Sequence, residues 1–154
     1  MTSTKKIFLN AFNTLELPNE RQHVLLKIVE GIATEYKKEG VVNLNFICTH
    51  NSRRSQLGQV WSFFAANYFN LNINAFSGGT EVTAFYKNTV KTLQSVGFIF
   101  DLEDFSHENP KYLISFDGSK KNILGFSKLF NNSVNTTPFI ALTTCNNAAD
   151  NCPF

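Results

Sequence analysis

The sequence lacks the features that mark several broad classes of protein. Its formal net charge is only +2, from 14 Lys and Arg against 12 Asp and Glu, which is too small to favour nucleic acid or a membrane surface as a partner. No hydrophobic run approaches the roughly 20 residues that a transmembrane helix needs. The apolar stretch Ile7–Phe12 is short and has no small-residue cleavage site, so no secretory signal peptide is predicted. We therefore expect a cytoplasmic protein.

Cysteine is also scarce. Three cysteines, an odd number, argue against a framework of structural disulfides when no secretory signal is present. In a reducing compartment a cysteine is either a buried small hydrophobe or a catalytic or metal-binding group. Cys145 and Cys152 have no further cysteine or histidine at the close spacing of zinc ligands. We therefore predict no metal site, and no motif indicates a cofactor.

Apolar residues are plentiful enough for one packed domain. Hydrophobic residues make up 43% of the chain and charged residues 17%, a balance that is typical of a folded protein and not of a disordered one. The length of 154 residues suits a single domain.

Hydrophobic periodicity predicts the order of helices and strands. Apolar residues recur at helical spacing between residues 18 and 39, and Gly40 can end that helix. We expect the apolar face of this helix to pack on the domain that follows. Further on, the pattern predicts a strand at 41–47, a helix at 56–70, a strand at 71–76, and a helix that begins at Thr83 and runs to about Val96. Alternating strands and helices are typical of a parallel sheet with crossover helices.

The pattern changes in the last third of the chain. Two short strands, at 112–116 and 122–126, flank an Asp-Gly pair and predict a β-hairpin. One more strand, at 138–144, leads directly into Cys145.

Cys48 stands where the first predicted strand meets the next helix. Residues 48–55 read Cys-Thr-His-Asn-Ser-Arg-Arg-Ser. A tight loop before a helix turns successive backbone N–H groups inward, and such a nest binds a tetrahedral oxyanion. Arg54 can grip two oxygens of that anion with its planar guanidinium group. The same field stabilises a thiolate, and Ser55 can donate its hydroxyl to the sulfur, so Cys48 is a candidate nucleophile.

The whole loop is therefore a candidate oxyanion site. Its expected contacts come from Thr49, His50, Asn51, Ser52, Arg53 and Arg54. Asn51 can adopt the left-handed backbone conformation that a tight loop requires. Other interpretations stay open: Cys48 as a buried structural cysteine, Arg53 as a solvated neighbour, and His50 as an ordinary loop residue instead of a general base.

Three segments resemble the low-molecular-weight protein tyrosine phosphatase family, and its arsenate reductase branch in particular. Residues 48–61 resemble the phosphate loop and first helix, where that branch has Cys-Thr-Gly-Asn-Ser-Cys-Arg-Ser. Residues 76–81, Phe-Ser-Gly-Gly-Thr-Glu, are similar to the family's Ser-Ala-Gly motif. Residues 144–153 resemble the redox segment of the branch, in which two cysteines seven positions apart follow a strand. The resemblance covers about residues 41–154.

The resemblance implies a thioredoxin-coupled arsenate reductase whose catalytic residues are Cys48, Arg54, Ser55, Cys145 and Cys152. Cys48 would attack arsenate, and Cys145 would then attack the adduct, releasing arsenite and leaving a Cys48–Cys145 disulfide. Cys152 would attack Cys145, and thioredoxin would reduce the final disulfide. The small and polar residues between Cys145 and Cys152 suit a segment that loops out or reorders. The alternative is that Cys145 is a buried strand-end residue and Cys152 an incidental thiol.

The chain departs from the family pattern at several positions. His50 replaces a glycine, Arg53 replaces a cysteine, and Gln59 stands where potassium-binding members carry a glutamate. We therefore predict no potassium site. The family's general-acid aspartate, last strand and C-terminal helix have no counterpart in the chain, so we expect the domain to be incomplete at its C-terminus.

These observations predict an α/β, three-layer, phosphatase-like fold with a central, mainly parallel sheet, an added N-terminal helix and a β-hairpin insertion. We expect a helical extension at 1–40 and a phosphatase-like arsenate reductase domain at 41–154. The expected partners are arsenate or a phosphate-like oxyanion, and thioredoxin as reductant. Two other functions stay open: a low-molecular-weight protein tyrosine phosphatase that uses Cys48 and Arg54 alone, and a non-catalytic oxyanion-binding module.

Overall fold

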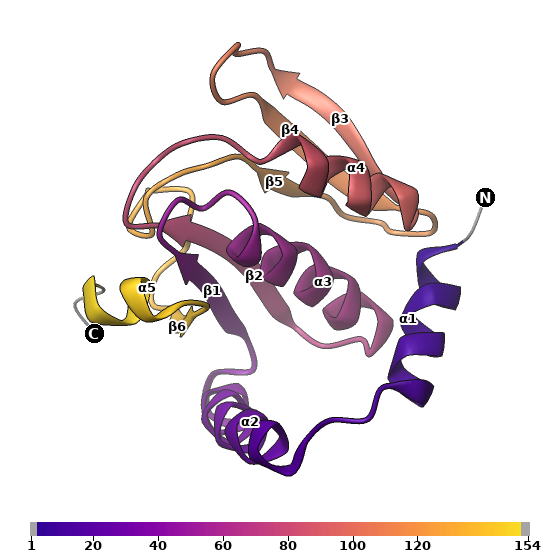
Figure 1. Cartoon of the computed structure of the whole chain (residues 1–154). Coiled ribbons are helices and arrows are strands. Elements are labelled where there is room, and N and C mark those ends of the chain that lie inside the picture. Colours follow the sequence, from indigo (N-terminus) through magenta and orange to yellow (C-terminus); the bar gives the residue numbers. More distant parts are fainter. Residues whose placement is uncertain (1–2, 152–154) are drawn as a thin grey trace.

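The computed structural model describes residues 3–151, which form a mixed α/β protein (Figure 1). The helices of this part are α1 (Thr4–Thr14), α2 (Asn19–Glu39), α3 (Arg54–Tyr68), α4 (Lys87–Ser95) and α5 (Asn146–Asn151). The strands are β1 (Val42–Cys48), β2 (Ile73–Gly79), β3 (Phe98–Asp104), β4 (Lys111–Phe116), β5 (Ile123–Gly125) and β6 (Ile140–Thr143). They form two separate three-stranded sheets.

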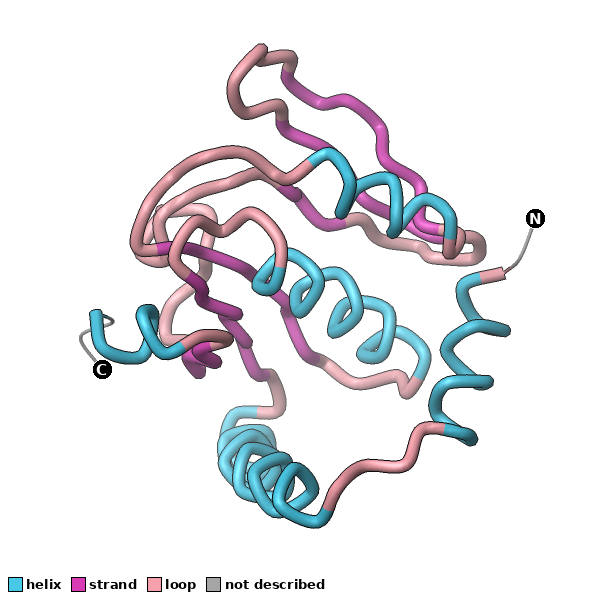
Figure 2. The backbone as a smooth tube through the Cα atoms, in the orientation of Figure 1, coloured by secondary structure: helices cyan, strands magenta, loops and turns pink. Residues whose placement is uncertain are grey.

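The first sheet is parallel and has the order β2-β1-β6. The predicted strands at 41–47, 71–76 and 138–144 are confirmed in it, with small shifts of their ends. β1 is central, and Cys48 at its end is level with Gly79 at the end of β2. The carboxyl ends of all three strands therefore meet at one edge, where several loops converge (Figure 2). Ligands of parallel sheets bind at this kind of edge.

The second sheet is antiparallel, with the order β3-β4-β5. The predicted hairpin is confirmed as β4 and β5, and Gly118 in its turn has a φ of 84°. β3 was not predicted, because only Phe98 of its seven residues is buried and its sequence does not alternate clearly. The predicted parallel sheet and hairpin are thus both present, but the hairpin pairs with β3 in a second sheet that was not predicted.

Helix α3 lies between the two sheets (Figure 1). On one side Val60 and Phe64 are buried in a cluster with residues of α4 and the antiparallel sheet. On the other side α3 approaches β1 closely at Gly58, where an added Cβ would lie 2.5 Å from the Phe46 ring. The helix begins and ends two residues earlier than the predicted 56–70. Because both of its faces are covered, polar residues of α3 are buried as well, and Gln56 and Gln59 are among them.

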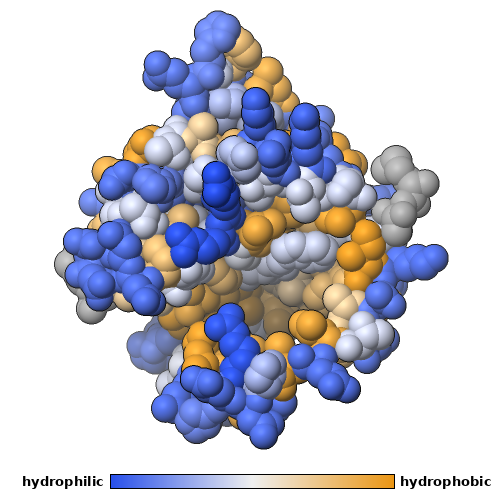
Figure 3. Space-filling view, viewed as in Figure 1, coloured by the Kyte–Doolittle hydropathy of each residue, from blue (hydrophilic) through white to orange (hydrophobic). Residues whose placement is uncertain are grey.

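The N-terminal part of the chain forms two helices. α1 was not predicted as a helix; it packs on α3 through Phe8, whose ring centroid lies 5.1 Å from that of Phe64. α2 is confirmed and ends at Gly40 with a φ of 71°. The expected packing of its apolar face is only partly correct, since Val24 and Val29 are 44% and 56% exposed. On the face shown in Figure 3, hydrophobic residues surround a hollow between α2 and the rest of the molecule. The proposed division at residue 40 stays a prediction.

Two other predicted segments differ from the structure. The helix predicted to begin at Thr83 begins at Lys87, because the Thr83 N–H donates to the Ser127 hydroxyl at 2.9 Å and holds this stretch as a loop. The segment after Cys145, expected to loop out or reorder, forms the short helix α5 in this structure. Ala148 of that helix is fully buried and packs in a cluster with Ile47, and this contact favours the helix.

Within residues 3–151, no helix is long and apolar enough to span a membrane.

Candidate functional site

The loop between β1 and α3 brings a thiol and a hydroxyl together. Cys48 ends β1 and Ser55 lies in the first turn of α3, and both are buried. The Cys48 Sγ and the Ser55 Oγ are 3.0 Å apart. The Ser55 Oγ also accepts from the Asn51 side-chain amide at 2.9 Å. Since the serine oxygen accepts from Asn51, its own hydrogen is free to point at the sulfur, where it stabilises a thiolate.

The main-chain carbonyl groups of the loop between β1 and α3 point outward. The carbonyl oxygens of residues 48–52 all accept hydrogen bonds from outside the loop, at 2.8–3.3 Å. The donors are the N–H groups of Thr80, Glu81 and Tyr86, the hydroxyls of Thr83 and Ser127, and the side-chain amide of Gln56. In a peptide unit the N–H points away from the C=O, so the N–H groups that follow these carbonyls face the interior of the loop. Those of residues 50–53 have no acceptor in the described part of the chain. Such inward N–H groups form an anion-binding nest.

Asn51 holds this arrangement in place. Its φ is 45°, the left-handed conformation that the sequence suggested, and it is fully buried. Its side chain donates to Ser55 and accepts from the backbone N–H of Lys128 at 2.9 Å. Its own carbonyl accepts from Gln56 at 3.0 Å. The loop is thus tied both to α3 and to residues 127–128, which are distant in the sequence.

A cavity of about 380 Å³ opens over the loop. It is lined by Cys48, His50, Ser52, Arg53, Arg54 and Thr83. Two arginines at the N-terminal end of α3 make it positive, and this end of the helix adds its own partial positive charge. No carboxylate of residues 3–151 lines the cavity, although His50 Nε2 lies 3.3 Å from Glu81 Oε2. The Arg53 guanidinium lies 4.2 Å from the centre of the Tyr86 ring, a cation–π contact that steadies it.

The structure therefore brings together four of the six predicted oxyanion contacts at the cavity. The other two predicted contacts, Thr49 and Asn51, are not among the residues that line the cavity. The Arg54 side chain lines the cavity, but its Nη1 donates to the Thr144 carbonyl at 3.1 Å. Arg54 thus connects the loop to the segment that follows β6.

A second thiol lies beside the loop. The Cys145 Sγ is 3.6 Å from the Thr49 Oγ1, and Thr49 follows Cys48 directly. The Thr49 hydroxyl also lies 3.1 Å from the Asn147 side-chain oxygen. Burial raises the pKa of the Cys145 thiol, but hydrogen bonds from the Ala148 N–H and from Thr49, together with the charge of Arg54, outweigh it, so the net pKa is lowered. A larger fraction of Cys145 is therefore thiolate at neutral pH than of an ordinary thiol.

The third predicted thiol, Cys152, lies outside the described residues. Cys48 and Cys145 are both free thiols. Within residues 3–151 no group of three or more His, Cys, Asp or Glu side chains is placed to hold a metal. Gln59, at the position linked to potassium binding, accepts from the Ser77 hydroxyl at 2.6 Å and donates to the Leu124 carbonyl at 3.2 Å. It connects the two sheets.

Several residues at the site were not predicted from the sequence. The hydroxyls of Thr83 and Ser127 both donate to the His50 carbonyl, and the Tyr86 ring contacts the Arg53 guanidinium. The Lys128 N–H donates to the Asn51 side chain. Lys128 is 2% exposed, and its Nζ has no hydrogen-bond partner among residues 3–151, although it lies 4.8 Å from the centre of the Phe126 ring. Burial lowers the pKa of Lys128 to about 7. No local pattern marks these residues, because they meet the loop only through the folding of distant segments.

Comparison with known proteins finds a similarity to an arsenate reductase. An arsenate reductase from Bacillus subtilis (strain 168) is 27% identical over 108 residues, which is 70% of this chain. The matched part is 60% of the length of that relative. No protein-family model matches the chain. No solved structure matches it significantly.

Proposed function

We propose that this protein is an arsenate reductase that uses Cys48, Cys145 and Cys152 as a thiol–disulfide relay. The observation that carries the proposal is the position of the second thiol, since the Cys145 Sγ lies 3.6 Å from Thr49 in the oxyanion loop. A phosphatase that uses Cys48 and Arg54 alone gives no reason for a thiol with a lowered pKa there. The similarity to the Bacillus subtilis arsenate reductase supports the same reaction class.

In the first step arsenate binds over the loop. The N–H groups of residues 50–53 and the guanidinium of Arg54 hold its oxygens, and Arg54 exchanges its bond to Thr144 for the anion. The Cys48 thiolate, stabilised by the Ser55 hydroxyl at 3.0 Å, attacks arsenic. A sulfur–arsenic bond forms, and one arsenate oxygen leaves as water.

In the second step the two electrons move to arsenic. The Cys145 thiolate attacks the Cys48 sulfur, a disulfide forms, and the sulfur–arsenic bond breaks with its electron pair left on arsenic, which departs as arsenite. Cys152 then attacks the Cys145 sulfur, and the Cys48 thiol is restored. An external dithiol such as thioredoxin reduces the Cys145–Cys152 disulfide. One arsenate and two thiols thus give arsenite, water and one disulfide, a cycle that suits a reducing cytoplasm.

The relay requires the segment after β6 to change its conformation. Cys145 and Cys152 are separated by the helix α5, which is only six residues long. Helices of this length are marginal on their own, so α5 depends on packing such as that of Ala148 beside Ile47. Loss of that packing would free residues 146–151 to reorder during the relay.

A single-turnover thiol map tests the proposal. The reduced protein is treated with one equivalent of arsenate, its thiols are trapped by alkylation, and disulfides and arsenite are quantified. We expect a Cys145–Cys152 disulfide, a free Cys48 and one arsenite per chain. Cys152→Ser should stop at the Cys48–Cys145 disulfide, and Cys145→Ser should produce no arsenite. Three free thiols without arsenite in the unmodified protein would refute the relay.

The same experiment discriminates the alternatives. The loop geometry also fits a phosphatase, but that reaction needs an acid for the leaving group, and none of the described carboxylates lines the cavity. Hydrolysis of an aryl phosphate that survives Cys145→Ser and Cys152→Ser would favour the phosphatase. Binding of phosphate and arsenate without turnover of either would favour an oxyanion-binding module.

A further inference from the structure

The outer edge of β2 is bonded along only part of its length. β2 is an edge strand of the parallel sheet. At its end, Gly79 donates to the Lys128 carbonyl at 2.8 Å and accepts from the Phe130 N–H at 2.9 Å, so Gly79 faces outward. At its start, the Asn72 carbonyl accepts from Val42 of the sheet and faces inward. Backbone groups alternate along a strand, so Ile73, Ala75 and Ser77 face outward too.

In the described part of the chain, the outward main-chain groups of Ile73 and Ala75 are unbonded, whereas a side chain bonds Ser77. The Ser77 carbonyl accepts from the Asn135 side chain at 3.1 Å. The outward N–H and C=O groups of Ile73 and Ala75 have no hydrogen-bond partner within residues 3–151. An unbonded strand edge is a template for another extended chain. Ala75 is nevertheless only 5% exposed, so this open edge is recessed and not displayed on the surface.

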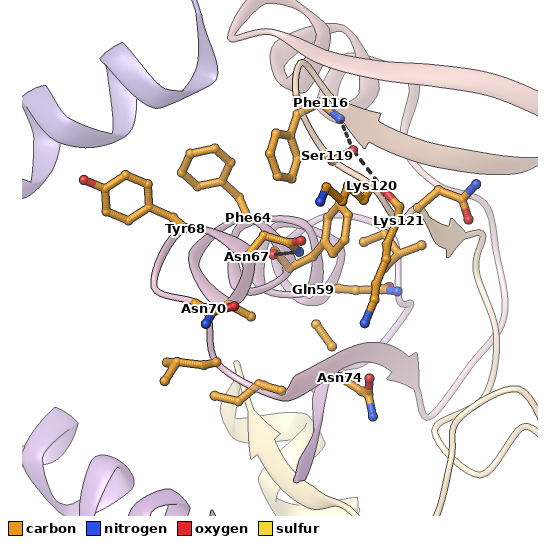
Figure 4. A pocket seen from close by; sticks show the side chains of 18 of the residues that line it. Gln59, Phe64, Asn67, Tyr68, Asn70, Asn74, Phe116, Ser119, Lys120 and Lys121 are labelled. Atoms are coloured by element: carbon orange, nitrogen blue, oxygen red, sulfur yellow. Dashed lines mark hydrogen bonds between the residues drawn. The ribbon is translucent and has the colours of Figure 1, made fainter. Parts of the chain in front are cut away.

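The edge is recessed because it forms one wall of a cavity of about 670 Å³ (Figure 4). The opposite wall is the β4–β5 turn, residues 116–124. The side formed by α3 is aromatic: Tyr68 is 38% exposed there, and the largely buried Phe63 and Phe64 lie behind it, 5% and 2% exposed. The cavity therefore combines a row of free main-chain groups with an apolar wall, the two elements that bind an extended peptide by strand addition.

The charges around the cavity indicate the chemistry of the segment that it would bind. Lys5, Lys120 and Lys121 line it, and none of them forms an ion pair within the described residues. Asp117 is the single carboxylate among the lining residues. Figure 4 shows Lys121 reaching from the turn toward β2. A segment with carboxylate side chains would complement these lysines.

We propose that this cavity binds an extended, acidic segment of another protein, which adds to the free edge of β2. Its main chain bonds the N–H and C=O groups of Ile73 and Ala75, alternate side chains pack against the aromatic wall, and its carboxylates meet the three lysines. A second copy of this chain is a poorer occupant, because its own lysines would face these. The site is separate from the oxyanion loop and does not depend on the proposed reaction.

The probe is a labelled eight-residue peptide in which glutamate alternates with valine. Hydrogen exchange of the Ile73 and Ala75 amides is followed by NMR during titration, and affinity is measured by fluorescence anisotropy. The control peptide has the same sequence with N-methyl groups on the amides that would face β2, so its charge is unchanged. We expect slower exchange at Ile73 and Ala75 with the first peptide, and at least about tenfold weaker binding of the second, because strand addition depends on main-chain bonds.

Charge reversal supplies a matched pair of variants. Lys120→Glu with Lys121→Glu changes two exposed lysines of the cavity, and Lys87→Glu with Lys91→Glu changes two exposed lysines of α4 by the same net charge. We expect the first pair to weaken peptide binding by roughly tenfold or more and the second pair to change it little. Both should reduce arsenate as the unmodified protein does.

Several results would overturn the proposal. Equal binding of both peptides, or binding without protection of Ile73 and Ala75, would show charge attraction alone. An equal loss of peptide affinity in the two double variants would also show charge attraction alone. Absence of binding up to millimolar peptide, tighter binding of a single-stranded oligonucleotide, or concentration-dependent self-association that protects Ile73 and Ala75 would each rule out an acidic protein segment as the occupant.

Discussion

The two cavities lie along the same helix, α3, but their walls are held in different ways. The smaller one, at the N-terminal end, has a main chain whose carbonyls are all bonded from outside and whose buried Asn51 and Ser55 are bonded to each other. The larger one has a free strand edge and exposed lysines and asparagines. A site for chemistry needs its groups pre-positioned, whereas a site that accepts another chain needs main-chain groups left open.

The largest expected difference between the regions comes from glycine substitutions. At Gly79 an added Cβ would lie 2.6 Å from the carbonyl oxygens of Thr49 and Glu81, so Gly79→Ala should lower the free energy of unfolding by more than about 3 kcal/mol. Gly118 lines the larger cavity with a φ of 84° and nothing within 4 Å, so Gly118→Ala should cost only about 1 kcal/mol of backbone strain. Urea unfolding measures both. Equal losses would mean that the loop is not tightly packed.

Two asparagines with the same backbone conformation give the next comparison. Asn51 and Asn70 have φ values of 45° and 52°, but Asn51 is buried in the loop and Asn70 is exposed at the larger cavity. Asn51→Ala should cost about 2–3 kcal/mol, because it strains the backbone and leaves buried polar partners unbonded. Asn70→Ala should cost at most about 1 kcal/mol. The two unfolding curves, with arsenate affinity measured alongside, check this, and similar losses would contradict the assigned role of Asn51.

The two lysine environments predict different dependences of stability on pH. Burial lowers the pKa of Lys128 from 10.5 to about 7. Below pH 7 both the folded and unfolded forms carry the proton, so the full cost of burying the charge is present, and this cost declines as pH rises from about 7 toward 10.5. Lys128→Met should therefore stabilise the protein at pH 6 by about 2 kcal/mol and progressively less at pH 8 and 9.5.

Lys121→Met, in the larger cavity, is the control. Its side chain is exposed, so the substitution should change the unfolding free energy by less than about 0.5 kcal/mol at every pH. A gain from Lys128→Met that does not vary with pH would show that the Lys128 ammonium has an unseen partner or is solvated.

The smallest predicted effect concerns the second thiol. Thr49→Val removes a hydroxyl that helps to lower the pKa of Cys145, so less thiolate should form and alkylation of Cys145 at pH 7 should slow by roughly twofold. Thr80→Val, which removes a neighbouring hydroxyl bonded to the Thr49 carbonyl at 3.4 Å, is the control and should leave that rate unchanged. Alkylation followed by mass spectrometry gives both rates.

Local patterns in the sequence were good predictors where a segment depends mainly on its neighbours. The helix closed by Gly40, the hairpin turn at Gly118 and the left-handed Asn51 all follow from backbone preferences of single residues. The prediction at Thr83 was wrong because a distant hydroxyl, that of Ser127, takes its N–H group. β3 was missed because its pairing with β4, and not its own alternation, makes it a strand.

By itself the sequence determined the strand–loop–helix unit around Cys48, because its apolar periodicity predicts the strand and the helix, and Asn51 favours the left-handed turn between them. Tertiary structure alone decided what surrounds that unit: the thiol of Cys145 beside Thr49, the buried Lys128 behind Asn51, and the free edge at Ala75. The physical reason is the range of the interactions. Turn and helix preferences act within a few residues, whereas the contacts of Cys145 and Lys128 join segments 96 and 77 positions apart, and only the packing of distant segments brings them together.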